Sequence, residues 1–204
     1  MAEEPSIPLP NQAINIINPK YCLSTPINLF IRRKIKDITN LKFVITNEIG
    51  NVIFKVKPVI SSRTLHETHL LVDDQDHPLL TIRRKIRTVH RRHQVYRGDS
   101  LEAKDLLFTV KKSCIGCVNV LDVMVESNVD VKGGSFRIQG SWLDRSCAVY
   151  LEQSPTVIAQ MNRKHAVNDL KQGQEAFMVK VHPYVDQAFI TTLLVIRSEI
   201  NDRD

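Results

Sequence analysis

The chain has 204 residues, of which 43% are hydrophobic and 25% are charged, and its formal net charge is +6. This hydrophobic fraction is sufficient for a core, which excludes a chain that is disordered throughout. The length fits one domain of ordinary size or at most two small ones. The positive charge favours an anionic partner, such as nucleic acid, phosphoinositides or acidic proteins, but does not choose among them.

The expected cellular location follows from what the sequence lacks. Residues Met1–Pro5 are acidic, whereas a secretory signal begins basic and continues apolar. The sequence has no Asn-x-Ser/Thr site, and four cysteines in a chain of this length do not form a disulfide framework. We therefore expect a reduced, cytoplasmic protein, with peripheral attachment to the plasma membrane and shuttling to the nucleus left open.

Residues 1–20 are polar and contain four prolines. We expect them to form a flexible tail that is attached near Ile14, Ile16 and Ile17. No low-complexity linker divides residues 21–204, which predicts a single domain.

Short strands dominate the chain from about residue 27. In the stretch Ile27–Ile38, apolar residues alternate with basic ones. A hairpin follows, with runs at Leu41–Ile45 and Val52–Lys57 around an Asn/Gly turn. The same strand–turn–strand pattern recurs at Leu70–Ile82 and Ala148–Met161. Its irregular spacing argues against a solenoid and favours a meandering antiparallel barrel or sandwich.

Further runs of β-branched and aromatic residues bring the expected total to about a dozen strands. They are Gln94–Tyr96, Leu106–Val110, Val118–Val125, Phe136–Gln139 and Phe177–Val181. Before the C-terminal segment, only Ser100–Asp105 is suited to a helical turn.

The segment Asp186–Ile200 is predicted to be a helix. Asp186 is a suitable N-cap, and Pro183 lies where the preceding strand should stop. From Ala188 to Ile196 only two threonines interrupt the apolar residues, after which Arg197 and Glu199 end the run. Such a helix must be enclosed or span lipid, and spanning needs about 20 apolar residues. A barrel of about a dozen strands leaves a lumen. The fold class we predict is therefore a mainly β, antiparallel barrel that encloses a central hydrophobic C-terminal helix.

Several blocks of the sequence resemble the plant LURP-one-related family, over most of the chain from about Ile38 to Ile200. These blocks are Val95–Gly98, Leu106–Ser113, Phe136–Cys147, Ile158–His165 and Pro183–Ile190. The resemblance implies the tubby C-terminal-like fold, a barrel of about 12 strands around a hydrophobic C-terminal helix. It also implies kinship with tubby proteins and phospholipid scramblases, and an association with pathogen defence. No local motif matches the phosphoinositide ligands of tubby proteins, so the resemblance assigns no ligand residues.

Two basic segments are candidate contacts for anionic lipid headgroups or phosphate. The stronger is residues 83–93, with Arg83, Arg84, Lys85, Arg87, Arg91 and Arg92; the weaker supplies Arg32, Arg33 and Lys34. Arginine binds phosphate through paired hydrogen bonds, and clustered cations attract anionic lipid. The simpler interpretation, which the sequence alone favours, is that these side chains form the ordinary solvent face of two strands. The lipid interpretation gains if the two segments lie side by side.

No motif for catalysis, metal or cofactor binding rises above background. Cys114 and Cys117 form a single CxxC without a second ligand pair, so we expect ordinary strand and turn cysteines. His66 and His69 do not have the spacing of a zinc-protease helix. There is no GxSxG, GxGxxG or P-loop pattern.

The sequence therefore predicts a non-enzymatic binding or adaptor protein without a cofactor. Its expected partner is a phosphoinositide-containing membrane, with a protein partner also open. Nucleic-acid binding or a transcription-linked role is the alternative, which the low aromatic content of 6% disfavours. A scramblase-like protein whose last helix enters lipid ranks last.

Overall fold

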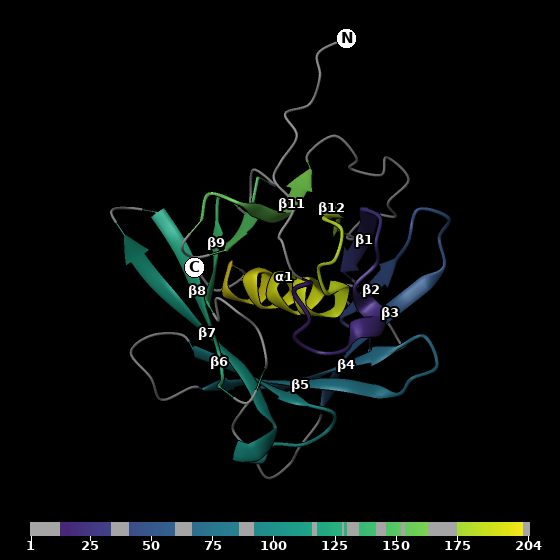
Figure 1. Cartoon of the computed structure of the whole chain (residues 1–204). Helices are drawn as coiled ribbons and strands as arrows, with labels where there is room; N and C mark the ends of the chain where they lie inside the picture. Colours follow the sequence, from purple (N-terminus) through teal and green to yellow (C-terminus); the bar gives the residue numbers. More distant parts are fainter. Residues whose placement is uncertain are drawn as a thin grey trace.

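The computed structural model describes residues 13–33, 41–59, 67–85, 92–115, 118–127, 129, 135–141, 146–151, 154–162 and 175–201. Within these residues, twelve strands surround one α-helix, as Figure 1 shows. The strands are β1 (Ile27–Arg33), β2 (Phe43–Thr46), β3 (Val52–Val59), β4 (Thr68–Asp73), β5 (Pro78–Lys85), β6 (Arg92–Arg97), β7 (Leu106–Ile115), β8 (Val118–Val125), β9 (Ser135–Gln139), β10 (Ala148–Leu151), β11 (Val157–Asn162) and β12 (Glu175–Val181).

Each strand pairs antiparallel with its neighbours in the chain, and β1 closes the barrel by pairing with β12 as well as β2. Ile31, for example, lies opposite Phe177 of β12 and Ile45 of β2. Side chains alternate between the two faces of each strand, so one set lines the interior. Leu29 and Ile31 of β1 are fully buried, whereas Arg32 between Ile31 and Arg33 is exposed. The predicted barrel is confirmed.

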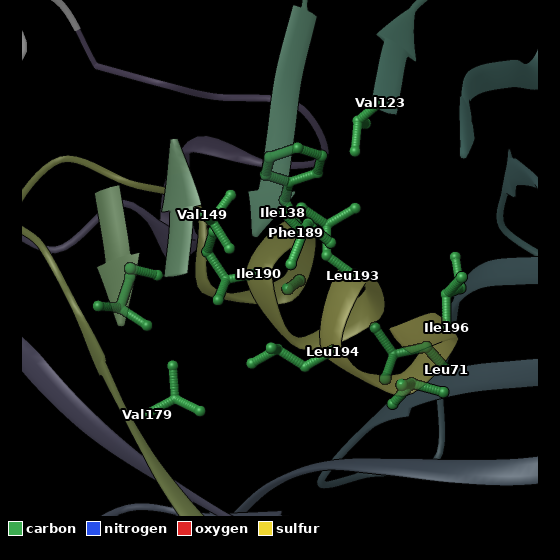
Figure 2. Packing of buried hydrophobic residues seen from close by; sticks show 14 of the residues in the cluster. Leu71, Val123, Ile138, Val149, Val179, Phe189, Ile190, Leu193, Leu194 and Ile196 are labelled. Atoms are coloured by element: carbon green, nitrogen blue, oxygen red, sulfur yellow. The ribbon is translucent and has the colours of Figure 1, made fainter. Parts of the chain in front are cut away.

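The helix α1 (Gln187–Asn201) lies along the interior of the barrel (Figure 1). Figure 2 shows Phe189, Ile190, Leu193, Leu194 and Ile196 projecting from different sides of α1. They meet wall residues such as Leu71, Val123, Ile138, Val149 and Val179, which come from β4, β8, β9, β10 and β12. Phe189 also packs against two phenylalanine rings, with centroids 5.2 Å away in Phe108 and 4.9 Å away in Phe136. Every residue from Gln187 to Ile200 is buried, which explains why the helix is apolar on nearly all sides.

Asp186 joins the beginning of α1 to the N-terminal segment 13–23. Its carboxylate accepts hydrogen bonds from the backbone N–H groups of Ala188 and Phe189, as the predicted N-cap should. It also accepts from the N–H groups of Ile17, at 2.7 Å, and Asn18, at 3.2 Å. We call the end of the barrel at which Asp186 lies the cap end.

The segment 13–23 packs against the cap end. Ile14 donates its N–H to the Tyr184 carbonyl at 2.8 Å, and its own carbonyl accepts from the Asp186 N–H at 3.0 Å. Ile14, Ile16 and Ile17 are buried, so the expected attachment at these residues is present. The short 3-10 helix Pro19–Tyr21 (η1) continues the segment, and a second one, Ala103–Asp105 (η2), lies within the helical turn expected at Ser100–Asp105.

Among the described residues, no helix has the length and apolar character needed to cross a membrane.

Candidate functional site

Three basic side chains from neighbouring strands stand opposite one another on the outer wall. Lys85, the last residue of β5, pairs with Arg92, the first residue of β6. Arg92 in turn pairs with Lys111 of β7. Since paired residues share a face and the next residue, His93, is buried inside, all three project outward. We call Lys85, Arg92 and Lys111 the cationic row.

The cationic row concentrates positive charge. Neighbouring strands lie roughly 4.8 Å apart, so the row places the backbones of three basic residues within about 10 Å. Arg83 projects from the same face two residues away on β5. The next residue across the sheet is Asp122 of β8, opposite Lys111, and its carboxylate accepts from Arg137 Nε at 3.4 Å. Like charges directly opposite one another destabilise a sheet, and Asp122 places an opposite charge at one end of the row.

A second group of charged residues lies inside the barrel, near the end of α1. Glu199 is 3% exposed, and its Oε1 lies 2.8 Å from Lys42 Nζ and 3.0 Å from His69 Nδ1. Its Oε2 lies 3.6 Å from His93 Nε2. Lys42 immediately precedes β2, while His69 and His93 are the second residues of β4 and β6. We call Lys42, His69, His93 and Glu199 the polar cluster, and this opening of the barrel the polar end.

The polar cluster holds an ionised carboxylate in the interior. Burial alone would raise the pKa of Glu199, but the neighbouring His93, His69 and Lys42 outweigh it and lower the pKa to about 2. Burial lowers the pKa of His69, with the Glu199 charge opposing this shift. Arg197, two residues before Glu199 on α1, is also buried and donates from Nη2 to the Gly140 carbonyl at 3.1 Å.

The described part of the chain offers no arrangement suited to nucleophilic or metal chemistry. Among its residues, no group of three or more His, Cys, Asp or Glu side chains could hold a metal ion. Burial raises the pKa of the Cys22 thiol to about 12 and also raises that of Cys147. Both therefore lack the thiolate character of a reactive cysteine. Cys114 lies in β7 as expected for a strand cysteine, and Cys117 lies outside the described residues.

Comparison with known proteins identifies the family. The model of the LURP-one-related family matches residues 27–198. The chain belongs to the LURP-one-related family. It is 42% identical to Protein LURP-one-related 15 of Arabidopsis thaliana over 97% of this chain and 90% of that protein. Protein LURP1 of the same plant is 42% identical, with 91% of this chain and 89% of that protein covered.

A solved structure agrees with both the family and the fold. An X-ray structure of a protein from Arabidopsis thaliana superposes with a TM-score of 0.69 and 38% sequence identity. The match covers 92% of this chain and 98% of that one. The resemblance to the LURP-one-related family that the sequence blocks suggested is thus confirmed.

The basic residues singled out in this LURP-one-related chain occupy different places on the barrel. Arg83, Lys85 and Arg92 lie on the outer face, with Lys85 and Arg92 in the cationic row. Arg84 pairs with His93 on the inward-facing register, and its Nη1 lies 3.6 Å from Glu67 Oε2. Arg87 and Arg91 lie outside the described residues.

The weaker segment is not next to the stronger one. Arg32 projects outward from β1, whereas Arg33 pairs with the inward-facing Phe43. Lys34 lies outside the described residues. The strands β2, β3 and β4 separate β1 from β5, which corresponds to roughly 20 Å along the wall. Arg32 is therefore no part of the cationic row.

Two features of the site escaped the sequence analysis. Lys111 joins the row through the register between β6 and β7, which alternation alone does not specify. Arg197 and Glu199 marked the end of the apolar run, yet both lie within α1 and are buried. Two opposite charges directly after an apolar run, together with histidines in strands, were the signals available for an internal polar group.

Proposed function

We propose that this LURP-one-related protein is a non-enzymatic adaptor that docks on phosphoinositide-containing membranes through the cationic row. The observation that carries the proposal is the register of Lys85, Arg92 and Lys111 on three adjacent strands. The rigid wall fixes the backbone positions of these residues before any ligand binds, so no backbone ordering entropy is lost on binding. A defence-signalling role at the cytoplasmic side of the plasma membrane is the biological setting that the family resemblance supports.

The charge distribution favours a phosphorylated lipid surface over a single carboxylate ligand. A headgroup with several phosphates offers several acceptors, and both lysine and arginine bind phosphate oxygens. Each basic residue near an anionic membrane contributes about 1 kcal/mol. Three such residues therefore account for about 3 kcal/mol, or on the order of 100-fold in partitioning.

The test is flotation with phosphatidylcholine vesicles, either alone or containing phosphatidylserine or a phosphoinositide. The triple variant K85E/R92E/K111E should lose at least on the order of 100-fold in partitioning to phosphoinositide vesicles. Binding of the natural protein should weaken with added salt, because salt screens exposed charges.

The matched control is K20E/K104E/K180E, whose cations lie outside the cationic row. Three Lys or Arg to Glu changes lower the formal net charge by 3 × 2, from +6 to 0, in both variants. The control should therefore retain most of the binding if placement, rather than total charge, matters. Equal losses in the two variants, or no vesicle binding at low salt, would overturn the proposal. DNA binding that persists at near-physiological salt in a gel shift would favour a nucleic-acid partner instead.

A further inference from the structure

The polar cluster contains a histidine whose protonation state is dictated by its neighbours. His69 Nδ1 lies 3.0 Å from Glu199 Oε1, and its Nε2 lies 3.3 Å from Lys42 Nζ. An ammonium group has only donors, so Nε2 must accept from Lys42. The ring proton therefore sits on Nδ1 and is donated to Glu199. This arrangement requires a neutral ring.

Protonation of the neutral His69 ring is unfavourable in this arrangement. A second proton must add to Nε2, which could then no longer accept from Lys42, and the new N–H would face the Lys42 ammonium. The His69 side chain is 8% exposed, so water screens this repulsion poorly. Lys42 is 24% exposed and has a path to solvent. A protonated His69 would still donate to Glu199 and would supply the positive charge that Lys42 had provided.

We propose that the polar cluster is a proton-operated latch on the last turn of α1, in which protonation of His69 displaces Lys42 from Glu199. In the closed state, Lys42 ties the chain entering β2 to α1 at 2.8 Å. In the open state that tie is broken, while β4 keeps its contact with the helix through His69. The inference does not depend on membrane binding.

The other charged groups around His69 do not remove this conflict. His93 faces the other oxygen of Glu199, and neither of its ring nitrogens has a hydrogen-bond partner in the structure. Glu67 is half exposed and lies 3.6 Å from Arg84, which offsets its charge. Arg197 is also buried on α1, but its guanidinium donates to the Gly140 carbonyl. Glu199 is thus the one buried carboxylate in this part of the described chain, and it faces several potential cations.

The direction of the pH effect follows from the pKa shifts. Because burial lowers the pKa of His69, the unfolded chain takes up this proton more readily than the folded one. The stability that neutral His69 contributes is present above pH 6.5 and is lost as the pH falls toward the lowered pKa. Glu199, with a pKa of about 2, stays ionised throughout this range. In the polar cluster, His69 is therefore the group whose lowered pKa sets the direction of the pH effect.

The direct test is an NMR titration of the histidine rings in the full chain between pH 8.5 and 5. His69 should be the Nδ1–H tautomer at high pH and should titrate below 6.5. The variant K42M removes the opposing cation and should raise the pKa of His69. The control K57M removes a lysine that is paired with Asp76 on the outer wall, and it should leave the pKa of His69 unchanged. A neutral Nε2–H tautomer, or an unshifted His69 in K42M, would overturn the latch.

A stability measurement provides a second, independent readout. Between pH 7.5 and 5.5 the unfolding constant of the natural protein should rise, by up to about tenfold per pH unit for one proton. H69Q cannot take up this proton and should show a shallower dependence. H77Q removes the exposed histidine beside Asp73 and should keep the natural slope. If H69Q does not fold, the NMR comparison of K42M and K57M decides the question; an H69Q slope equal to that of H77Q argues against the latch.

Discussion

Replacing Asp186 with alanine should be among the most damaging changes outside the apolar core. The carboxylate accepts four backbone hydrogen bonds, two from the first turn of α1 and two from Ile17 and Asn18. Loss of an N-cap costs about 1–2 kcal/mol, and an unsatisfied buried N–H such as that of Ile17 costs about 1–3 kcal/mol. The Asn18 N–H is partly buried, so water can replace its partner. We expect a total loss of about 2–5 kcal/mol.

For a chain of this size, that loss corresponds to a fall in Tm of about 10 °C. Thermal unfolding followed by circular dichroism measures it directly. D186N keeps one acceptor oxygen for the helix but turns an amide donor toward other N–H groups. Its fall in Tm should therefore lie between zero and that of D186A. D74A, at an exposed turn, should leave the Tm nearly unchanged. A Tm for D186A within about 2 °C of the natural protein would refute the role of Asp186 as the joint between the N-terminal segment and α1.

Two further substitutions test the packing around the helix. L194K buries a charge at a position that is 1% exposed, so the protein should fail to fold, with no separate membrane-targeting defect; a folded L194K variant in a denaturant titration would contradict this. G140A should also destabilise the protein, by about 2 kcal/mol or more, because Gly140 has φ of 109° and an added Cβ would meet the Ser146 carbonyl oxygen. Urea unfolding measures this loss, and K180A on the outer wall is the comparison.

The local sequence pattern was sufficient to predict the barrel and its helix. Alternating apolar residues marked most strands. The run from Ala188 to Ile196 is apolar on nearly all sides, so only a closed wall could bury all of its side chains. The expected helix, Asp186–Ile200, differs from the observed Gln187–Asn201 by one residue at each end. Asp186 acts as the N-cap, which by definition lies just outside the helix.

The arrangement of charged residues was less accessible to sequence analysis, because it depends on register and on contacts between distant segments. The partners of Glu199 come from β4, from β6 and from Lys42, the residue before β2. Lys42 is 157 positions away from Glu199 in the chain. Nothing local distinguishes such a glutamate from a solvent-exposed one at the end of a helix. The cationic row likewise combines Lys85 and Arg92, which are close in sequence, with Lys111, whose place depends on the β6–β7 pairing.

Amide hydrogen exchange with and without phosphoinositide vesicles tests most directly whether α1 remains the enclosed core of a barrel that docks through its outer wall. The account predicts strong protection for amides Phe189–Ile196, since opening there requires global unfolding. Vesicles should leave this protection unchanged and slow exchange in β5, β6 and β7 around Lys85, Arg92 and Lys111. Faster exchange throughout α1 on vesicle binding, with no change in those strands, would contradict it.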